Sequence, residues 1–399
     1  MINYLKKMMF RAIRSKTAKI IYKKIFHIIS FLPKKKNVIV FESFHGKQYS
    51  DSPRAIYEYM KKYEPSCKLI WSVDRRYTGL FRKLGIPYII RFTPKWFWTM
   101  PRSKYWVNNV RIPNWMPKPK DTVFVQTWHG TPLKRLGLDI EEIKMPGTNT
   151  ERYKKNFSRQ TKKWDYLVSP NDYSSKIFKK AFDYSGNIIE TGYPRNDYLY
   201  TFTEENVRNI KKRLNIPLDK KVILYAPTWR DNHYYSVGRY RFNLSLDLKF
   251  MREKLGDDFV VLLRMHYLIA ENLDVIEYEG FAYDVSNYLD IKDLYIISDI
   301  LITDYSSVFF DYANLRRPII FYVYDLEEYR DQLRGFYFDL QKNAPGPLTT
   351  TTREVVEEIN KFFNNGFQVD ENFNNFYNKF CYLEDGNASK RVVDKFYRD

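Results

Sequence analysis

A histidine at the end of an apolar segment is the residue of this chain best suited to proton transfer. The run VFVQTWHGTPLK (123–134) predicts a buried strand that leads into a tight turn. His129 stands at the mouth of that strand, beside Gly130 and Pro132. The near-neutral pKa of imidazole suits a general base that takes a proton from an alcohol. A turn histidine bonded to backbone is the other interpretation of the same pattern.

Cationic side chains follow two further apolar segments. In VVLLRMH (260–266), Arg264 and His266 come at the end of a predicted strand and point to the same face. Such a pair suits a diphosphate, although one salt bridge at a strand end would explain it equally. Arg230 follows the strand of YAPTWRD (225–231) and could bind phosphate, unless it belongs to a surface Arg–Asp turn.

The segment DILITDYSSV (299–308) predicts a strand, a turn and the start of a helix. Ser306 or Ser307 suits the N-cap, which leaves backbone N–H groups and a positive helix end aimed at the strand tip. That arrangement could hold a phosphate, and ordinary capping is the simpler explanation. Asp311, about one turn into the helix, could hydrogen-bond a ribose diol.

The first predicted strand is followed by FHGKQYSD (44–51), where Gly46, Lys47 and Asp51 are the predicted acceptor-binding residues. His45 is a rival base without an apparent partner. The chain lacks the glycine-rich phosphate loops and metalloprotease motifs, and it has no Asp-x-Asp pair to hold a metal on a nucleotide diphosphate. We therefore predict neither a metal nor a cofactor, and expect cationic side chains and a helix terminus to neutralise a leaving phosphate.

The elements that must position these residues come in two sets of alternating strands and helices. Two consecutive βα sets imply an α/β fold with two parallel-sheet, Rossmann-like lobes. We place the first lobe at residues 37–205 and the second at 206–399. Ligands of such sheets bind at the carboxyl ends of the strands and in the central cleft between lobes. Each candidate site residue follows a predicted strand, as this rule requires.

The charge of the chain adds a preference for anions. Lys and Arg number 66 against 47 Asp and Glu, a net charge of +19, and residues 1–36 contain many of the bases and no acid. Residues 2–20 predict a basic amphipathic helix, and the apolar stretch that follows is too short to span a bilayer. We expect 1–36 to bind an anionic membrane surface, peripherally on the cytoplasmic face. A helix packed on the body and a nucleic-acid arm are the alternatives. Two cysteines exclude a disulfide framework.

Several long segments together resemble the CDP-glycerol glycerophosphotransferase family of teichoic acid synthesis. They run in order along the body: FESFHGKQYSDSPRAIYEYM (41–60), QTWHGTPLKRLGLD (126–139), TGYPRNDYL (191–199), YAPTWRD (225–231), LLRMHY (262–267) and SDILITDYSSVFFDYANLRRPIIFY (298–322). The resemblance implies a GT-B-like fold, with the acceptor on the first lobe and the CDP donor on the second. It also implies CDP-glycerol as donor and a polyprenyl-diphosphate-linked disaccharide as acceptor.

The resemblance also implies roles for residues. His129 would be the base, Arg230 and His266 would contact the donor phosphates, and Thr303, Ser306 and Ser307 would bind the diphosphate, with Asp311 on the ribose. Because the catalytic body follows only a short basic segment, we expect a primase that adds the first glycerol phosphate. A poly(glycerol phosphate) polymerase and a CDP-ribitol-using relative are the alternatives within the family. A non-catalytic binder of anionic membranes or nucleic acid is the alternative outside it, nucleic acid is not an expected partner of the enzyme, and a homo-oligomer stays open.

Overall fold

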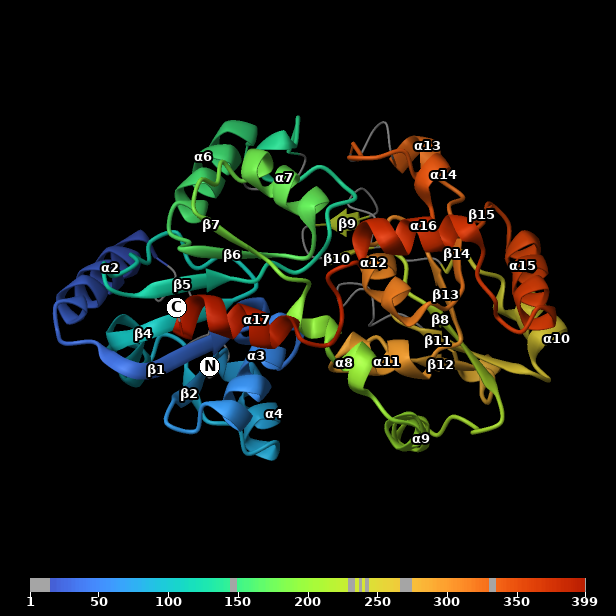
Figure 1. Cartoon of the computed structure of the whole chain (residues 1–399), viewed down its shortest axis with the longest axis horizontal. Helices are drawn as coiled ribbons and strands as arrows, with labels where there is room; N and C mark the ends of the chain where they lie inside the picture. Colours follow the sequence, from blue (N-terminus) through green and yellow to red (C-terminus); the bar gives the residue numbers. More distant parts are fainter. Residues whose placement is uncertain are drawn as a thin grey trace.

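The chain folds into two α/β lobes, drawn side by side in Figure 1. This computed structural model describes residues 15–143, 149–228, 234–236, 239–240, 244–265, 275–329 and 335–398. Most of the predicted helix 2–20 lies outside these residues, and so do Arg230 and His266. The predicted architecture of two successive parallel-sheet lobes is confirmed.

The first lobe contains a seven-stranded parallel sheet in the order β3-β2-β1-β4-β5-β6-β7. Its strands are β1 (Lys35–Glu42), β2 (Lys68–Val73), β3 (Tyr88–Ile90), β4 (Ser103–Asn108), β5 (Val123–Gln126), β6 (Tyr166–Ser169) and β7 (Asn187–Glu190). The helices between them are α3 (Asp51–Tyr63), α4 (Thr78–Lys83), α5 (Pro94–Thr99), α6 (Thr150–Thr161) and α7 (Asp172–Ala181). The central strand β1 reads as a continuous apolar run because both of its faces are covered.

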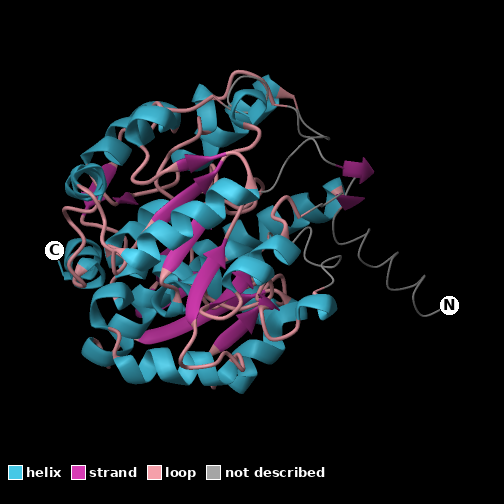
Figure 2. Ribbon diagram, turned by 90° about the vertical axis from the view of Figure 1, so that its right-hand side faces the viewer, coloured by secondary structure: helices cyan, strands magenta, loops and turns pink. Residues whose placement is uncertain are grey.

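The second lobe contains a six-stranded parallel sheet in the order β12-β11-β8-β13-β14-β15. Its strands are β8 (Lys221–Tyr225), β11 (Phe259–Leu263), β12 (Ala282–Asp284), β13 (Ile300–Thr303), β14 (Ile319–Tyr322) and β15 (Leu348–Thr349), and the short pair β9 (Tyr234–Ser236) and β10 (Arg239–Tyr240) is separate. Its helices are α9 (Glu204–Arg213), α10 (Leu248–Leu255), α11 (Ile291–Ile297), α12 (Val308–Tyr312), α13 (Leu326–Glu328), α14 (Leu340–Asn343), α15 (Thr352–Asn364) and α16 (Glu371–Phe380), with α8 (Tyr198–Thr201) at the junction. Figure 2 shows helices on both sides of the strands.

Helix α2 (Lys16–Ser30) precedes β1 and has two apolar faces. One packs on the body, where Phe26 is fully buried against Trp96 and Trp106. The other stays exposed and includes Ile28 and Phe31, which are 67% and 76% accessible. Among the described residues, no helix has both the length and the apolar character to span a bilayer.

The last described helix, α17 (Ala388–Val393), returns to the first lobe, where Figure 1 shows it near β1 and α3. Val392, Val393 and Phe396 share a core with strand β1, and Phe396 packs edge-on against Tyr105 of β4. The predicted domain boundaries, after residue 36 and after residue 205, stay predictions. Residues 388–398 nevertheless pack with the first lobe rather than with the second, because their apolar side chains complete its core.

Candidate active site

The carboxyl ends of the two sheets meet at a junction where His129 lies next to helix α12. The turn after β5 carries Trp128, His129 and Gly130, and Ser307 precedes α12 on the other lobe. A Cβ atom on Gly130 would lie 2.8 Å from the Ser307 hydroxyl oxygen, which shows how closely the two turns approach. The structure thus brings the predicted base and the predicted phosphate-binding turn together.

The hydrogen bonds of His129 determine which nitrogen can accept a proton. Its Nδ1 lies 2.8 Å from the carbonyl oxygen of Asn109, and a carbonyl can only accept, so Nδ1 carries the hydrogen. Nε2 is then the unprotonated nitrogen. The residue keeps an exposed face, yet the protein atoms around the ring desolvate it and lower its pKa below the ordinary value of 6.5. A neutral imidazole with a free Nε2 has the form that a general base requires.

The turn after β13 carries three residues that were predicted to bind the donor, and their surroundings differ. Thr303 is fully buried, and its hydroxyl donates to the Ala226 carbonyl at 2.7 Å, so this side chain holds β13 to the end of β8. Ser306 and Ser307 are half-buried, and Ser307 occupies the N-cap of α12 without a side-chain cap hydrogen bond. A phosphate contact of the two serines stays a prediction.

A buried ion pair that the sequence did not predict joins the lobes beside this turn. Arg195 donates to both carboxylate oxygens of Asp311, at 2.9 and 3.1 Å, and its Nη1 lies 3.6 Å from Asp51. A ribose contact of Asp311 stays a prediction, but its carboxylate is already bound by Arg195 and Asn196. The resembling segment 191–199 contains Arg195, and membership of that segment was the available signal.

Residues 191–199, which contain Arg195 and lead towards the second lobe, also bind the segment that returns to the first lobe. Glu384 accepts from the backbone N–H of Tyr193 at 2.9 Å and from the Asn196 amide at 3.0 Å. Burial raises the pKa of Glu384 to about 8. The two crossings between the lobes, near residues 191–203 and 381–388, are therefore tied to each other and to Asp311.

Of the two arginines that were predicted to bind the donor, the structure describes Arg264 but not Arg230. Arg264 follows β11, and its Nη1 donates to the carbonyl oxygens of Val285 and Ser286 at 2.7 and 2.5 Å. One nitrogen of this guanidinium is thus committed to the loop after β12. Arg230 and His266 lie outside the described residues, and their contacts with a donor stay predictions.

The predicted acceptor residues sit at the end of β1. Gly46 has a φ of +79°, and a Cβ there would lie 2.7 Å from the Asp74 backbone nitrogen, so this glycine is required by packing. Lys47 is half-buried, and its charge contributes to a lowered pKa of His45, for which burial is the main cause. Asp51 begins α3 next to Arg195. An acceptor contact of each stays a prediction.

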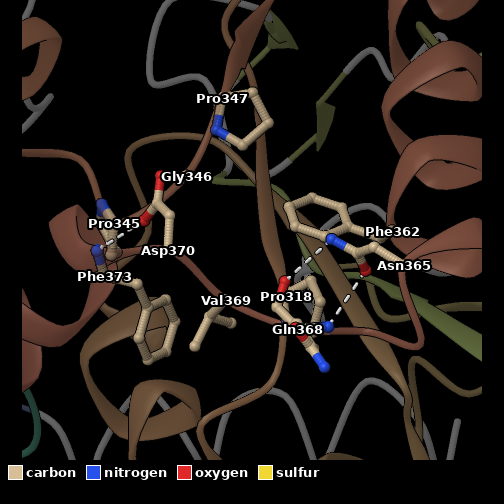
Figure 3. Close-up of a pocket in the computed structure, with 10 residues that line it drawn as sticks. All are labelled: Pro318, Pro345, Gly346, Pro347, Phe362, Asn365, Gln368, Val369, Asp370 and Phe373. Carbon is tan, nitrogen blue, oxygen red and sulfur yellow. Dashed lines mark hydrogen bonds between the residues drawn. The ribbon is translucent and has the colours of Figure 1, made fainter.

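Other hollows and clusters do not compete with this junction. The groove drawn in Figure 3 is lined by three prolines and by Phe362 and Phe373, at the amino ends of β14 and β15. It lies on the edge of the sheet opposite the carboxyl ends and presents no catalytic side chain. Within the described ranges, no group of three or more His, Cys, Asp or Glu side chains is placed to hold a metal ion.

Two parallel-sheet α/β lobes that meet at the carboxyl ends of their strands define a GT-B-like fold. Over residues 24–397 the chain matches the family described as CDP-Glycerol:Poly(glycerophosphate) glycerophosphotransferase. The chain belongs to this family of enzymes, and the resemblance drawn from the sequence is confirmed.

Curated relatives and solved structures agree with this assignment. The chain is 56% identical over 378 residues to the teichoic acid poly(glycerol phosphate) polymerase of Bacillus subtilis strain 168, covering 94% of this chain but 51% of that protein. It is 54% identical to the polymerase of the same description from Bacillus spizizenii, covering 95% of it. A structure of the wall teichoic acid polymerase TagF with CDPG superposes with a TM-score of 0.86 at 42% identity, over 100% of this chain and 98% of that one.

The predicted primase activity is wrong. The relatives at 54–56% identity are poly(glycerol phosphate) polymerases, whereas the glycerol-phosphate primase of Bacillus subtilis is 34% identical over 280 residues. The expectation rested on the short basic segment before the body. Length does not discriminate, because the chain spans about half of one polymerase and nearly all of another.

The ion pair between the lobes gives a stability prediction. Arg195→Leu leaves the Asp311 carboxylate buried without its counterion, and we expect a loss of about 3–5 kcal/mol in the free energy of unfolding, measured by urea denaturation. The double variant Arg195→Leu/Asp311→Leu should recover part of that loss, because neither of these two charges stays buried and only Asp51 still lacks its arginine neighbour. Arg208→Leu removes an exposed pair with Glu204 and serves as the control. Equal losses in the single and double variants would contradict this role.

Proposed function

We propose that this chain extends a lipid-linked poly(glycerol phosphate), taking glycerol phosphate from CDP-glycerol and releasing CMP. The observation that carries the proposal is the neutral imidazole of His129, with a free Nε2, next to the serine turn of the other lobe. The family description and the relatives supply the donor and the acceptor class. Because the curated relative of Bacillus subtilis is about twice as long, the proposal concerns the transfer step.

The transfer is a substitution at phosphorus. The terminal hydroxyl oxygen of the acceptor attacks the phosphorus that bears the glycerol, and His129 Nε2 takes the hydroxyl proton. The bond from that phosphorus to the bridging oxygen breaks, and CMP leaves with the electron pair. Positioning and charge stabilisation account for most catalysis in phosphoryl transfer, so the protein must hold both oxygens in line.

Negative charge grows on the leaving CMP, and the second lobe offers groups to stabilise it. Ser306 and Ser307 precede α12, whose first N–H groups point out of the helix at the junction. Arg264 adds a positive charge at the end of β11. Arg230 and His266, outside the described residues, complete the donor set that the resemblance implies.

The exposed face of α2 supports docking on an anionic membrane surface. Ile20, Ile21, Ile28 and the C-cap residue Phe31 are at least half accessible, and Lys19, Lys23 and Lys24 are exposed on the same helix. Beside it, Lys35, Lys68, Lys95 and Arg102 line a pocket that contains Trp98 and no acidic residue. Apolar side chains inserted among the lipid headgroups and lysines near the lipid phosphates would both contribute to the free energy of membrane binding.

The products of the reaction test the proposed function. With CDP-glycerol and a synthetic lipid acceptor that ends in glycerol phosphate, the wild-type chain should give a ladder of masses spaced by one glycerol phosphate. His129→Ala should lose turnover by at least about a hundredfold, since a general base contributes on that order, yet still bind CDP-glycerol in calorimetry. Absence of transfer by wild type would refute the proposed function. Normal turnover by His129→Ala would refute the assignment of His129 as the base.

The lowered pKa of His129 sets the acid limb of the pH profile. The base works unprotonated, so kcat/KM falls only when pH drops through the pKa of His129, which lies below 6.5. We therefore expect kcat/KM for the acceptor at pH 6.5 to stay above half of its plateau value in a pH–rate series at saturating donor. An acid limb centred above pH 6.5 would show that the imidazole is not held in the neutral form.

Membrane docking is testable on the exposed face of α2. Ile28→Glu/Phe31→Glu places charge where apolar side chains would insert, and we expect at least a tenfold weaker flotation with liposomes that contain anionic lipid, because each buried apolar side chain contributes about 1.5–3 kcal/mol. Ile276→Glu changes an equally exposed residue of the second lobe and should float like wild type. Unchanged flotation of the double variant, or binding indifferent to salt, would refute this surface.

A further inference from the structure

Among the arginines that follow strands whose carboxyl ends face the junction are Arg91 after β3, Arg111 after β4, Arg195 after β7 and Arg264 after β11. Three of them have oxygen partners in the protein. Arg91 binds Glu42 and the His45 carbonyl, Arg195 binds carboxylates, and Arg264 binds two carbonyls. Within the described residues, Arg111 has neither a carboxylate nor a carbonyl partner.

The surroundings of Arg111 are aromatic. Its guanidinium lies over the rings of Phe157 and Tyr153 of α6, 4.7 and 5.4 Å from their centroids. The side chain is half-buried, and burial lowers the pKa of Arg111. Arginine stays protonated in proteins, so a desolvated guanidinium without an anion is costly. The aromatic faces hold its plane, but they leave its N–H edge without an acceptor.

Contacts place this cation close to the proposed base. Phe157 packs against Trp128, and Trp128 stacks on His129 with ring centroids 4.5 Å apart. The charge of Arg111 lowers the pKa of both His129 and His45. Arg111 also follows Asn109, whose carbonyl orients His129, by two residues. The guanidinium and the base therefore belong to the same side of the junction, on the first lobe.

We propose that Arg111 binds the last phosphodiester of the acceptor chain and so selects acceptors that already end in glycerol phosphate. This inference rests on the proposed function, which puts the donor phosphates on the second lobe and leaves the acceptor to the first. A terminal glycerol has its free hydroxyl on one side and its phosphodiester on the other. With that hydroxyl at His129, the phosphodiester supplies the anion that Arg111 lacks in the protein, and a planar guanidinium can bind two phosphate oxygens at once.

The test compares two synthetic acceptors that differ in one charge. One ends in a glycerol phosphodiester and the other in the matching neutral methylphosphonate, and each is titrated at saturating CDP-glycerol. Arg111→Gln should raise KM for the charged acceptor about 10–100-fold, the loss expected for hydrogen bonds to a charged group. It should leave KM for the neutral acceptor and for CDP-glycerol within about twofold of wild type.

Matched control variants separate the loss of a phosphodiester contact from a defect of folding. Arg316→Gln removes another arginine stacked on an aromatic ring, 3.7 Å from the Tyr377 centroid in the second lobe, and should behave as wild type. Arg111→Lys keeps the charge and should recover part of the acceptor KM, whereas a defect of folding would also weaken CDP-glycerol binding in calorimetry. Calorimetry with soluble glycerophosphoglycerol gives a direct measure, and binding should be lost in Arg111→Gln.

Each outcome decides one question. Transfer by wild type with an unchanged acceptor KM in Arg111→Gln would overturn this inference while leaving the proposed function intact. So would an equal rise in KM for both acceptors, or a rise confined to CDP-glycerol. Absence of any transfer from CDP-glycerol by wild type would instead refute the proposed function.

Discussion

The paired charges of Arg195 and Asp311 fix the geometry on which the junction depends. The arginine comes from the linker that leaves the first lobe and the aspartate from α12 of the second, and both are almost fully buried. Breaking such a pair is costly, because the charge left behind is desolvated. The same helix begins at Ser307, which touches the turn of His129. The ion pair therefore holds α12 to the first lobe, beside the approach of Ser307 to Gly130.

Around this pair, the structure assigns the polar groups of the junction to distinct tasks. Thr303, Gly46 and Glu384 are engaged in packing or in backbone hydrogen bonds. Ser306 and Ser307 keep hydroxyls without a cap role, and the free nitrogen of His129 is fixed by the bond from its other nitrogen to Asn109.

The sequence predicted the elements well and the long-range pairs poorly. Apolar runs such as VIVF and VVLL identified buried strands because a parallel sheet covered on both faces needs uninterrupted apolar residues. Residues directly after strands, such as His129 and Ser307, could be located by that rule. Arg195 and Arg111 could not be ranked, since their roles depend on which oxygens lie near them after folding. The primase activity was also predicted wrongly, because segment length carries no information on the chemistry of a substrate.

The return of α17 to the first lobe has a consequence for the order of folding during synthesis. Phe396 packs on Tyr105, and the whole second lobe lies between them in the sequence. A ribosome therefore completes the second lobe before it releases the residues that close the first. Contacts so distant along the chain form slowly, and the early lobe meanwhile exposes apolar surface. The core of the first lobe is thus completed only after α17 has been synthesised.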